Sequence, residues 1–251
     1  MKPVLLCLCI LLAMVFAPAA PAVAQQTPYA LADTSGRQVS YVWQQPVYAS
    51  ATVAMFFAGA SPLFIGYAQR PNMLIREEMQ LFRRSQFNNR RYEFDNGLQC
   101  LPIFSMLLLN LAGVPTEHNL WQQSLRAASA FAISSAIVLP VKELTNEMRP
   151  DRSSTNSFPS GHTATAFLGA ELLRLEYGQV SPWIPAAGYT IAAFTGVMRI
   201  YNDRHWAGDV LAGAAIGIVS ANISFWLNDK IDKFISARKK QQLIGVSCCS
   251  F

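Results

Sequence analysis

Residues 179–228 decide the fold, because two apolar runs in this stretch flank one short polar segment. The first run, QVSPWIPAAGYTIAAFTGVM, covers residues 179–198, and the second, VLAGAAIGIVSANISFWLN, covers residues 210–228. A bilayer core requires about 20 residues of apolar helix, so both runs have the length of membrane-spanning helices. Between them lies RIYNDRHWAGD, residues 199–209. The stretch predicts two helices joined by a polar segment that carries ionisable side chains.

Other apolar stretches extend this pattern along the chain. Residues 38–69 and 96–116 are uncharged, and 127–141 and 163–170 are shorter uncharged runs that need flanking residues or neighbouring helices to span a membrane. Period-two alternation is scarce, and Ala and Leu are abundant. The predicted fold class is all-α, a membrane helical bundle of about five to six apolar helices. Gly213 and Gly217 form a small-xxx-small pair, which indicates either close helix packing or simple tolerance of small residues.

The composition excludes several other classes of protein. Hydrophobic residues make up 52% of the 251 residues and charged residues 14%, which is incompatible with a disordered chain. The net charge of +5 suits a negatively charged partner such as anionic lipid, phosphate or nucleic acid. The five cysteines lack metal-ligand spacing and form no disulfide framework. The cysteine spacing indicates no zinc site, and no carboxylate cluster lies near the polar segments to hold Mg²⁺, so we expect no metal and no cofactor.

The two ends of the chain differ from the core. Residues 1–24 read as a secretory signal peptide, with Lys2 before an apolar run and an A-x-A site; an uncleaved membrane anchor is the alternative. Residues 25–95 are predicted to hold one apolar helix and an Arg-rich amphipathic region, which indicates an interface-lying helix rather than a nucleic-acid patch. Residues 96–229 form the predicted core, and residues 230–251 a basic C-terminal tail.

The chemistry-bearing residues begin at the end of the 127–141 run. Lys142 lies seven residues before Arg149-Pro150, so both cations would point the same way if one helix continued through them, although Pro150 favours a boundary at Arg149. Two cations at a helix end suit a phosphate, whereas a pair of snorkelling interface cations is the alternative. Ser160 is placed to cap a helix that exposes the amides of Gly161 and His162 to an anion. The alternative is that Ser160 is an ordinary N-cap with no role in ligand binding.

A second polar segment carries His205 and Asp209. Their spacing of four places them on one helical face, where Asp209 would accept from one ring nitrogen and leave the other as a nucleophile. A structural His–Asp pair is the alternative, but ionisable pairs beside membrane segments are costly and are usually functional.

Taken in order, these motifs resemble the three signatures of the type 2 phosphatidic acid phosphatase (PAP2) superfamily. The matching elements are Lys142-x6-Arg149-Pro150, Pro159-Ser160-Gly161-His162 and Arg199-x5-His205-x3-Asp209. The resemblance covers residues 142–209 directly and extends over about 98–228 through the helical pattern. One departure is Met198, which stands where the family usually has a serine before the third-motif arginine.

The resemblance implies a metal-independent phosphatase that works through a phosphohistidine. His205 would attack phosphorus, Asp209 would orient its ring, and His162 would protonate the leaving alkoxide and then deprotonate water. The phosphate oxygens would be held by Lys142, Arg149, Ser160, the Gly161 amide and Arg199. Met198 would leave one phosphate hydrogen bond missing or supplied elsewhere.

The same resemblance implies a membrane lipid as the substrate and the bilayer as the setting. Residues 199–206 and the region around Ile75 are similar to PAP2 proteins of Bacteroidetes bacteria, some of which act on lipid A. Lipid A phosphate is therefore the first expected substrate, followed by phosphatidate, phosphatidylglycerol phosphate and undecaprenyl pyrophosphate. Alternatives are a broad-specificity periplasmic acid phosphatase, a vanadate-dependent haloperoxidase, and a non-catalytic membrane lipid-binding protein. No nucleic-acid partner and no obligate protein partner are expected.

The expected location is a bacterial inner membrane with the site facing the periplasm. This topology requires that the apolar run near residues 50–68, broken by Ser61-Pro62, does not fully cross the membrane. The basic tail would then be cytoplasmic and satisfy the positive-inside rule, whereas the Arg-rich 70–95 region favours the opposite orientation.

Overall fold

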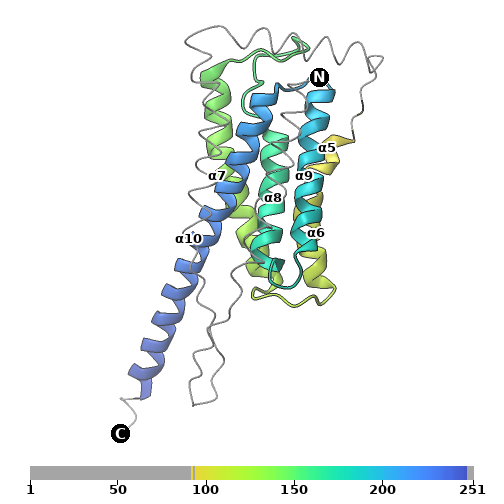
Figure 1. Ribbon diagram of the computed structural model, residues 1–251. Coiled ribbons are helices and arrows are strands. Elements are labelled where there is room, and N and C mark those ends of the chain that lie inside the picture. Colours follow the sequence, from red (N-terminus) through yellow and green to blue (C-terminus); the bar gives the residue numbers. More distant parts are fainter. Residues whose placement is uncertain (1–91, 93, 248–251) are drawn as a thin grey trace, which may run out of the picture.

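The computed structural model describes Tyr92 and residues 94–247, and every regular element in this part of the chain is an α-helix. Figure 1 shows the helices α6 to α10 side by side in a bundle, with the short α5 beside α9. The prediction of an all-α bundle is confirmed. The helices are α5 (Asp95–Leu98), α6 (Leu101–Leu111), α7 (Leu120–Thr145), α8 (Gly161–Tyr177), α9 (Trp183–Tyr201) and α10 (Ala207–Ser247).

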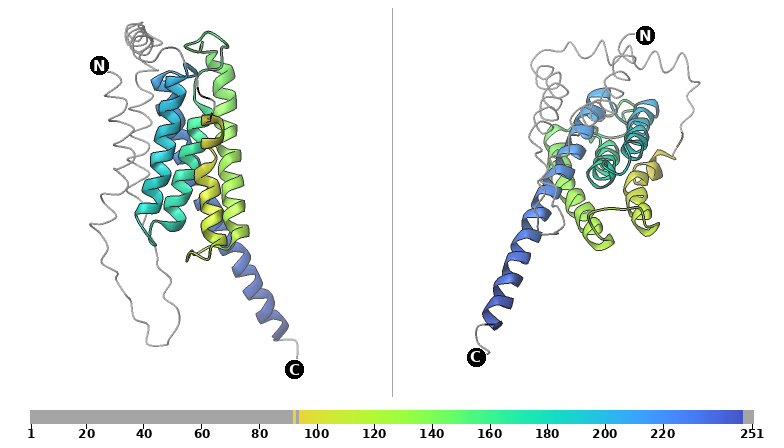
Figure 2. Two further views of the ribbon diagram at one scale, coloured as in Figure 1. Left: turned by 90° about the vertical axis from the view of Figure 1, so that its right-hand side faces the viewer. Right: turned by 60° about the horizontal axis from the view of Figure 1, so that its bottom comes forward.

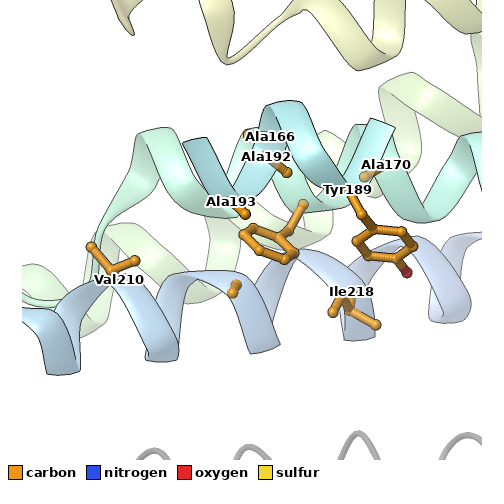
Figure 3. Packing of buried hydrophobic residues seen from close by; sticks show 9 residues of the cluster. Ala166, Ala170, Tyr189, Ala192, Ala193, Val210 and Ile218 are labelled. Atoms are coloured by element: carbon orange, nitrogen blue, oxygen red, sulfur yellow. The ribbon is translucent and has the colours of Figure 1, made fainter. Parts of the chain in front are cut away.

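Helix α8 is the centre of the bundle and contacts α6, α7, α9 and α10. One core cluster joins α8 to α9 and α10, and Figure 3 shows Tyr189 of this cluster with Ala170 and Ile218 nearby. A second cluster, which includes Met106, joins α8 to α6, α7 and α10. Alanines in the core allow the helix axes to approach closely, so α8 is nearly enclosed by its neighbours.

The charged residues that interrupt the apolar run of α8 are satisfied inside the bundle. Arg174 Nε and Nη2 donate to the two Glu171 carboxylate oxygens at 2.9 and 2.6 Å. The hydroxyl of Tyr189 donates to the same carboxylate, and Asn222 Nδ2 donates to it at 2.7 Å. A buried charge is tolerated only when it is paired and hydrogen-bonded, which is the case for Glu171. These residues therefore tie α8 to α9 and α10 without leaving the core.

Gly213 and Gly217 lie where α10 crosses α8 at close range. A Cβ atom at Gly213 would collide with the carbonyl oxygen of Ser160, and one at Gly217 would collide with the carbonyl oxygen of Ala164. The colliding atoms belong to the backbone, so they cannot move aside as a flexible side chain would. The structure therefore supports a packing role for both glycines over simple tolerance.

Two helices in the described residues, Leu120–Thr145 and Ala207–Arg238 within α10, are long and apolar enough to cross a membrane by length and composition. The short run at 127–141 reaches this length because the flanking residues continue the helix in both directions. The run at 179–198, expected to span, gives the 19-residue α9, which begins only after Pro182 and does not reach the same apolarity. The run at 96–116 gives α5 and the 11-residue α6 rather than one long helix.

Helix α10 continues beyond the other helices of the bundle, as both views in Figure 2 show. It runs without a break across residues 229 and 230, where the core and the basic tail were expected to meet. The signal peptide expected at residues 1–24 lies outside the described residues, as does the segment at 25–91 with its apolar helix and most of the Arg-rich region.

Candidate active site

Two loops at one end of the bundle bring the predicted motifs together. The α7–α8 loop covers residues 146–160 and the α9–α10 loop covers residues 202–206. The backbone N–H of Asp151 donates to the carbonyl of Asp203 at 3.2 Å, and Trp206 Nε1 donates to the carbonyl of Met148 at 2.8 Å. An ion pair of 3.5 Å between Arg204 and Asp151 adds a side-chain link. The three motifs, separate in sequence, therefore share one rigid end face.

His205 lies in the α9–α10 loop and is almost completely buried, with 2% of its surface exposed. Its Nδ1 lies 2.7 Å from the carbonyl oxygen of Ser157. A carbonyl oxygen only accepts, so Nδ1 carries the proton and Nε2 keeps its lone pair in the neutral ring. Burial lowers the pKa of His205, and the charges of Lys142 and Arg199 lower it further, whereas Asp209 raises it. The ring is thus held neutral with one nucleophilic nitrogen.

Asp209 supports this ring in a different way from the one predicted. The prediction that His205 and Asp209 share a helical face is wrong, because α10 begins only at Ala207 and leaves His205 in the loop. The two side chains still lie 3.6 Å apart, from Nδ1 to Oδ2, which is an ion-pair distance rather than a hydrogen bond. Asp209 Oδ2 accepts from the Ser157 hydroxyl and from the Trp206 amide at 2.8 Å.

Ser157 is a site residue that the sequence did not reveal. It is fully buried, and it contributes its carbonyl to His205 and its hydroxyl to Asp209. The carbonyl contact has no sequence signal, since every residue has a carbonyl group. The hydroxyl lies among several serines and threonines in residues 153–157, none of which the spacing singles out.

Three predicted cations surround this pair from different elements. Lys142 lies in the last turn of α7 and donates to the carbonyl of Asn156 at 2.7 Å, Arg149 lies in the α7–α8 loop, and Arg199 lies in the last turn of α9. Helix α7 ends at Thr145 with Asn146 in the left-handed region at φ 45°, so the helix does not continue from Lys142 to Arg149. The loop, rather than helical periodicity, brings the two cations to one end.

Arg199 is buried, Lys142 and Arg149 are partly buried, and the positive charges repel one another. Burial lowers the pKa of Arg149, and the neighbouring guanidinium groups of Arg204 and Arg199 lower it further. The Nε atoms of both Arg149 and Arg199 are buried and have no hydrogen-bond acceptor among the described residues. Buried unpaired donors are costly, and an anion with several oxygens would satisfy them and relieve the repulsion.

The start of α8 completes the site. Ser160 is the N-cap, and its side chain accepts from the amide of Thr163 at 3.4 Å. The first amides of a helix lack intrahelical acceptors, so the Gly161 and His162 amides face the end of the bundle as donors. His162 Nε2 lies 3.0 Å from Asn96 Oδ1. The structure therefore brings all eight predicted site residues to this end of the bundle.

Helix α5 adds two residues that lie outside the predicted motifs. Asp95, 1% exposed, accepts from Arg199 Nη1 at 2.8 Å, and Asn96 contacts His162. The sequence placed these residues at the boundary of the N-terminal segment, about 100 positions from Arg199. Met198, which replaces the usual serine, is buried on α9 and has no hydroxyl to offer a phosphate. Within the described part of the chain, no group of three His, Cys, Asp or Glu side chains is arranged to hold a metal ion.

An all-α bundle with an N-capped helix, clustered cations and a buried histidine at one end has the charge and the hydrogen-bond donors that suit an anion. The sequence model of the PAP2 superfamily matches residues 46–233, and the chain belongs to this superfamily. The resemblance that the three motifs indicated is thus confirmed.

Individual relatives agree with this assignment. The lipid A 1-phosphatase of Porphyromonas gingivalis is 44% identical over 140 residues, which cover 55% of this chain and 32% of the relative. The chain spans only 26 to 36% of the length of the three curated relatives that it matches.

Two solved structures are also similar. The transmembrane PAP2-type phosphatidylglycerolphosphate phosphatase of Bacillus subtilis has a TM-score of 0.52 at 22% identity, over 72% of this chain and 96% of that one. It shows that the fold is that of a transmembrane PAP2 protein. LpxE of Aquifex aeolicus has a TM-score of 0.45 at 26% identity, over 59% and 93% of the two chains.

Proposed function

We propose that this protein is a metal-independent phosphatase that hydrolyses a lipid phosphate monoester through a phosphohistidine. The observation that carries the proposal is the environment of His205. Its Nδ1 donates to the Ser157 carbonyl, which leaves the Nε2 lone pair free beside cations whose Nε donors lack acceptors among the described residues. A neutral histidine with a lone pair in a cationic pocket is suited to attack phosphorus.

The reaction has two steps that exchange one phosphoryl group. In the first, Nε2 of His205 forms a bond to phosphorus while the bond from phosphorus to the alkoxide breaks, and His162 gives its proton to that oxygen. In the second, water forms the new phosphorus–oxygen bond, His162 takes the water proton, and the nitrogen–phosphorus bond breaks. Lys142, Arg149, Arg199, Ser160 and the Gly161 amide hold the other oxygens, which carry most of the charge in a loose transition state.

The lipid is the part of the proposal that the relatives support. The Porphyromonas relative is a lipid A 1-phosphatase, and its match to this chain makes a lipid A phosphate the first candidate substrate. Phosphatidate, phosphatidylglycerol phosphate and undecaprenyl pyrophosphate follow it. We place the protein in a bacterial inner membrane with the site toward the periplasm, after removal of residues 1–24.

Mass spectrometry of membrane lipids from strains with and without the gene tests the substrate. Lipid A with one additional phosphate in the deletion strain is the expected result, and restoration of the original mass requires active protein. The matched control is complementation with His205→Ala, which should leave the extra phosphate in place. Unchanged lipid A in the deletion strain would remove lipid A from the proposal.

Sidedness is tested with a single cysteine at position 153. Ser153 is exposed in the α7–α8 loop, and a Ser153→Cys variant without the other cysteines carries one reactive thiol near the site. A periplasmic site predicts that a membrane-impermeant thiol reagent labels intact spheroplasts. Labelling only after lysis would place the site in the cytoplasm.

A further inference from the structure

The segment before α6 is fixed to the end of α9 that carries Arg199. Asn202, which follows α9, accepts from the backbone amide of Tyr92 at 3.0 Å and donates to the Tyr92 carbonyl at 2.7 Å. The ring of Phe94 stacks on Phe194 with centroids 6.2 Å apart. These contacts hold Tyr92 and Phe94 against α9 and so place α5 at the site.

Asp95 uses this position to hold the guanidinium of Arg199. Its carboxylate accepts from Arg199 Nη1 at 2.8 Å, and both side chains are buried. Charge-assisted hydrogen bonds of this kind are short and directional. Arg199 is therefore fixed with one terminal nitrogen toward α5. Its position shows which way the side-chain amide of Asn96 is turned.

Asn96 lies between Arg199 and His162. Its Oδ1 is 3.5 Å from Arg199 Nη1 and 3.0 Å from His162 Nε2. A guanidinium has donors only, so the amide atom that faces it must be the oxygen. Because that oxygen accepts, the His162 nitrogen that faces it must carry a proton. The contact thus selects the ring tautomer with hydrogen on Nε2.

We propose that Asn96 is a positioning residue that holds His162 in the Nε2–H tautomer, so that Nδ1 is the nitrogen that exchanges the catalytic proton. This inference rests on the proposed function. Protonated His162 gives the Nδ1 proton to the leaving alkoxide and becomes the neutral ring that Asn96 still binds through Nε2–H. The water that attacks the phosphohistidine then returns a proton to Nδ1. One proton leaves and one arrives, and the hydrogen bond to Asn96 is kept throughout.

The test compares two variants of similar size. Asn96→Leu removes the acceptor, and Asn96→Asp keeps an acceptor at the same position; Asn96→Ala repeats the deletion with a smaller side chain. Gln99→Ala is the matched control, because Gln99 donates only to the backbone carbonyl of Asn96 and does not contact His162. All variants are the full chain purified in detergent, and their monodispersity and thermal unfolding are recorded first.

Two substrates with different leaving groups distinguish a loss of His162 positioning from an overall loss of active enzyme. Dioleoyl phosphatidate releases a poor alkoxide that needs a proton, whereas p-nitrophenyl phosphate releases a phenolate that needs little. General acid catalysis contributes roughly 10²–10⁴-fold, so loss of the acceptor should lower kcat for phosphatidate by about 10- to 100-fold, with KM nearly unchanged. The rapid-quench burst of p-nitrophenol should change by less than about threefold, since its first step does not depend on the acid.

Asn96→Asp should recover most of the lost kcat while raising KM, because the added negative charge faces the bound phosphate. Gln99→Ala should behave as wild type with both substrates. Equal losses for the two leaving groups in Asn96→Leu and Asn96→Ala, no loss at all, or failure of Asn96→Asp to recover kcat would overturn the inference. A wild-type protein that releases phosphate from neither substrate would instead refute the proposed function.

Discussion

The close contact between α10 and α8 can be disrupted at either of two glycines, Gly213 and Gly217, which lie one helical turn apart on α10. In Gly213→Ala the new Cβ would collide with the Ser160 carbonyl oxygen and lie 3.3 Å from Thr163 Cβ. In Gly217→Ala it would collide with the Ala164 carbonyl oxygen and lie 2.8 Å from the Leu168 amide nitrogen. Both clashes are with backbone, so α10 and α8 must separate locally in either variant.

The expected loss of stability is similar in the two variants. Overpacking of this kind costs about 1–3 kcal/mol. For a domain of this size, each kcal/mol lowers Tm by roughly 2–4 °C. Each variant should therefore unfold several degrees below wild type in the same detergent. The two variants are therefore destabilised to a similar extent, and they differ in where α10 clashes with α8.

The expected loss of activity differs, because only Gly213 contacts the site. Ser160 caps α8, and its amide donates to the carbonyl of Asp209 at 3.0 Å, so displacement of Ser160 moves the start of α8 relative to the His205 loop. A misplacement of about 1 Å at reacting groups costs on the order of 10²-fold. We expect kcat/KM of Gly213→Ala to fall by about that factor, and that of Gly217→Ala by less than tenfold.

The assay is phosphate release from dioleoyl phosphatidate at a temperature well below both Tm values. Thermal unfolding of the same samples is the control for folded fraction. Equal losses of kcat/KM in the two variants would refute the reasoning, because they would show that global destabilisation, not the position of Ser160, determines activity. Wild-type activity in Gly213→Ala would refute it as well.

Burial lowers the pKa of His205 and Asp209 raises it, so the acid limb of activity that reports His205 should lie below the ordinary histidine range. Asp209→Asn should move this acid limb to still lower pH, and an alkaline displacement of the limb, measured with one substrate for both enzymes, would contradict the assignment. His205→Ala should abolish the p-nitrophenol burst, whereas His162→Ala should keep a burst followed by slow turnover, and rapid-quench traces of the opposite pattern would exchange the two roles. Activity should survive EDTA and be inhibited by vanadate; loss of turnover in EDTA that Mg²⁺ restores would show that a metal takes part.

The fold can be predicted from the sequence because helices leave clear patterns in continuous stretches of residues. Apolar runs of helical length identify α7, α9 and α10, and Ser160 marks the start of α8 by its capping chemistry. The ends of the runs are less informative. Residues 120–126, which mix polar and apolar side chains, form the first turns of α7 before the uncharged run, and the buried Arg126 pairs with Asp229 at 2.7 Å. A partner 103 positions away along the chain has no local signal.

The site separates in the same way into predictable and unpredictable parts. His205, His162 and Asp209 stand out because ionisable groups are rare between apolar runs. The residues that hold the two histidines do not stand out in the sequence. The backbone carbonyl of Ser157 contacts His205, and the side-chain amide of Asn96 contacts His162 from 66 positions away. Such contacts depend on how loops cross, which spacing in one segment does not encode.

The supports of the two histidines also differ in a way that bears on chemistry. An acceptor holds the Nδ1 proton of His205, which leaves Nε2 as the unprotonated nitrogen, and a different acceptor faces Nε2 of His162, which leaves Nδ1. On the proposed mechanism, one ring must form a bond to phosphorus and the other must move a proton. Opposite tautomers would prepare the His205 ring for attack on phosphorus and the His162 ring for proton transfer before the substrate binds. A site that holds its groups in this way needs little reorganisation during reaction, which is the source of most electrostatic catalysis. Exchanging the acceptors should therefore impair catalysis more than it impairs phosphate binding.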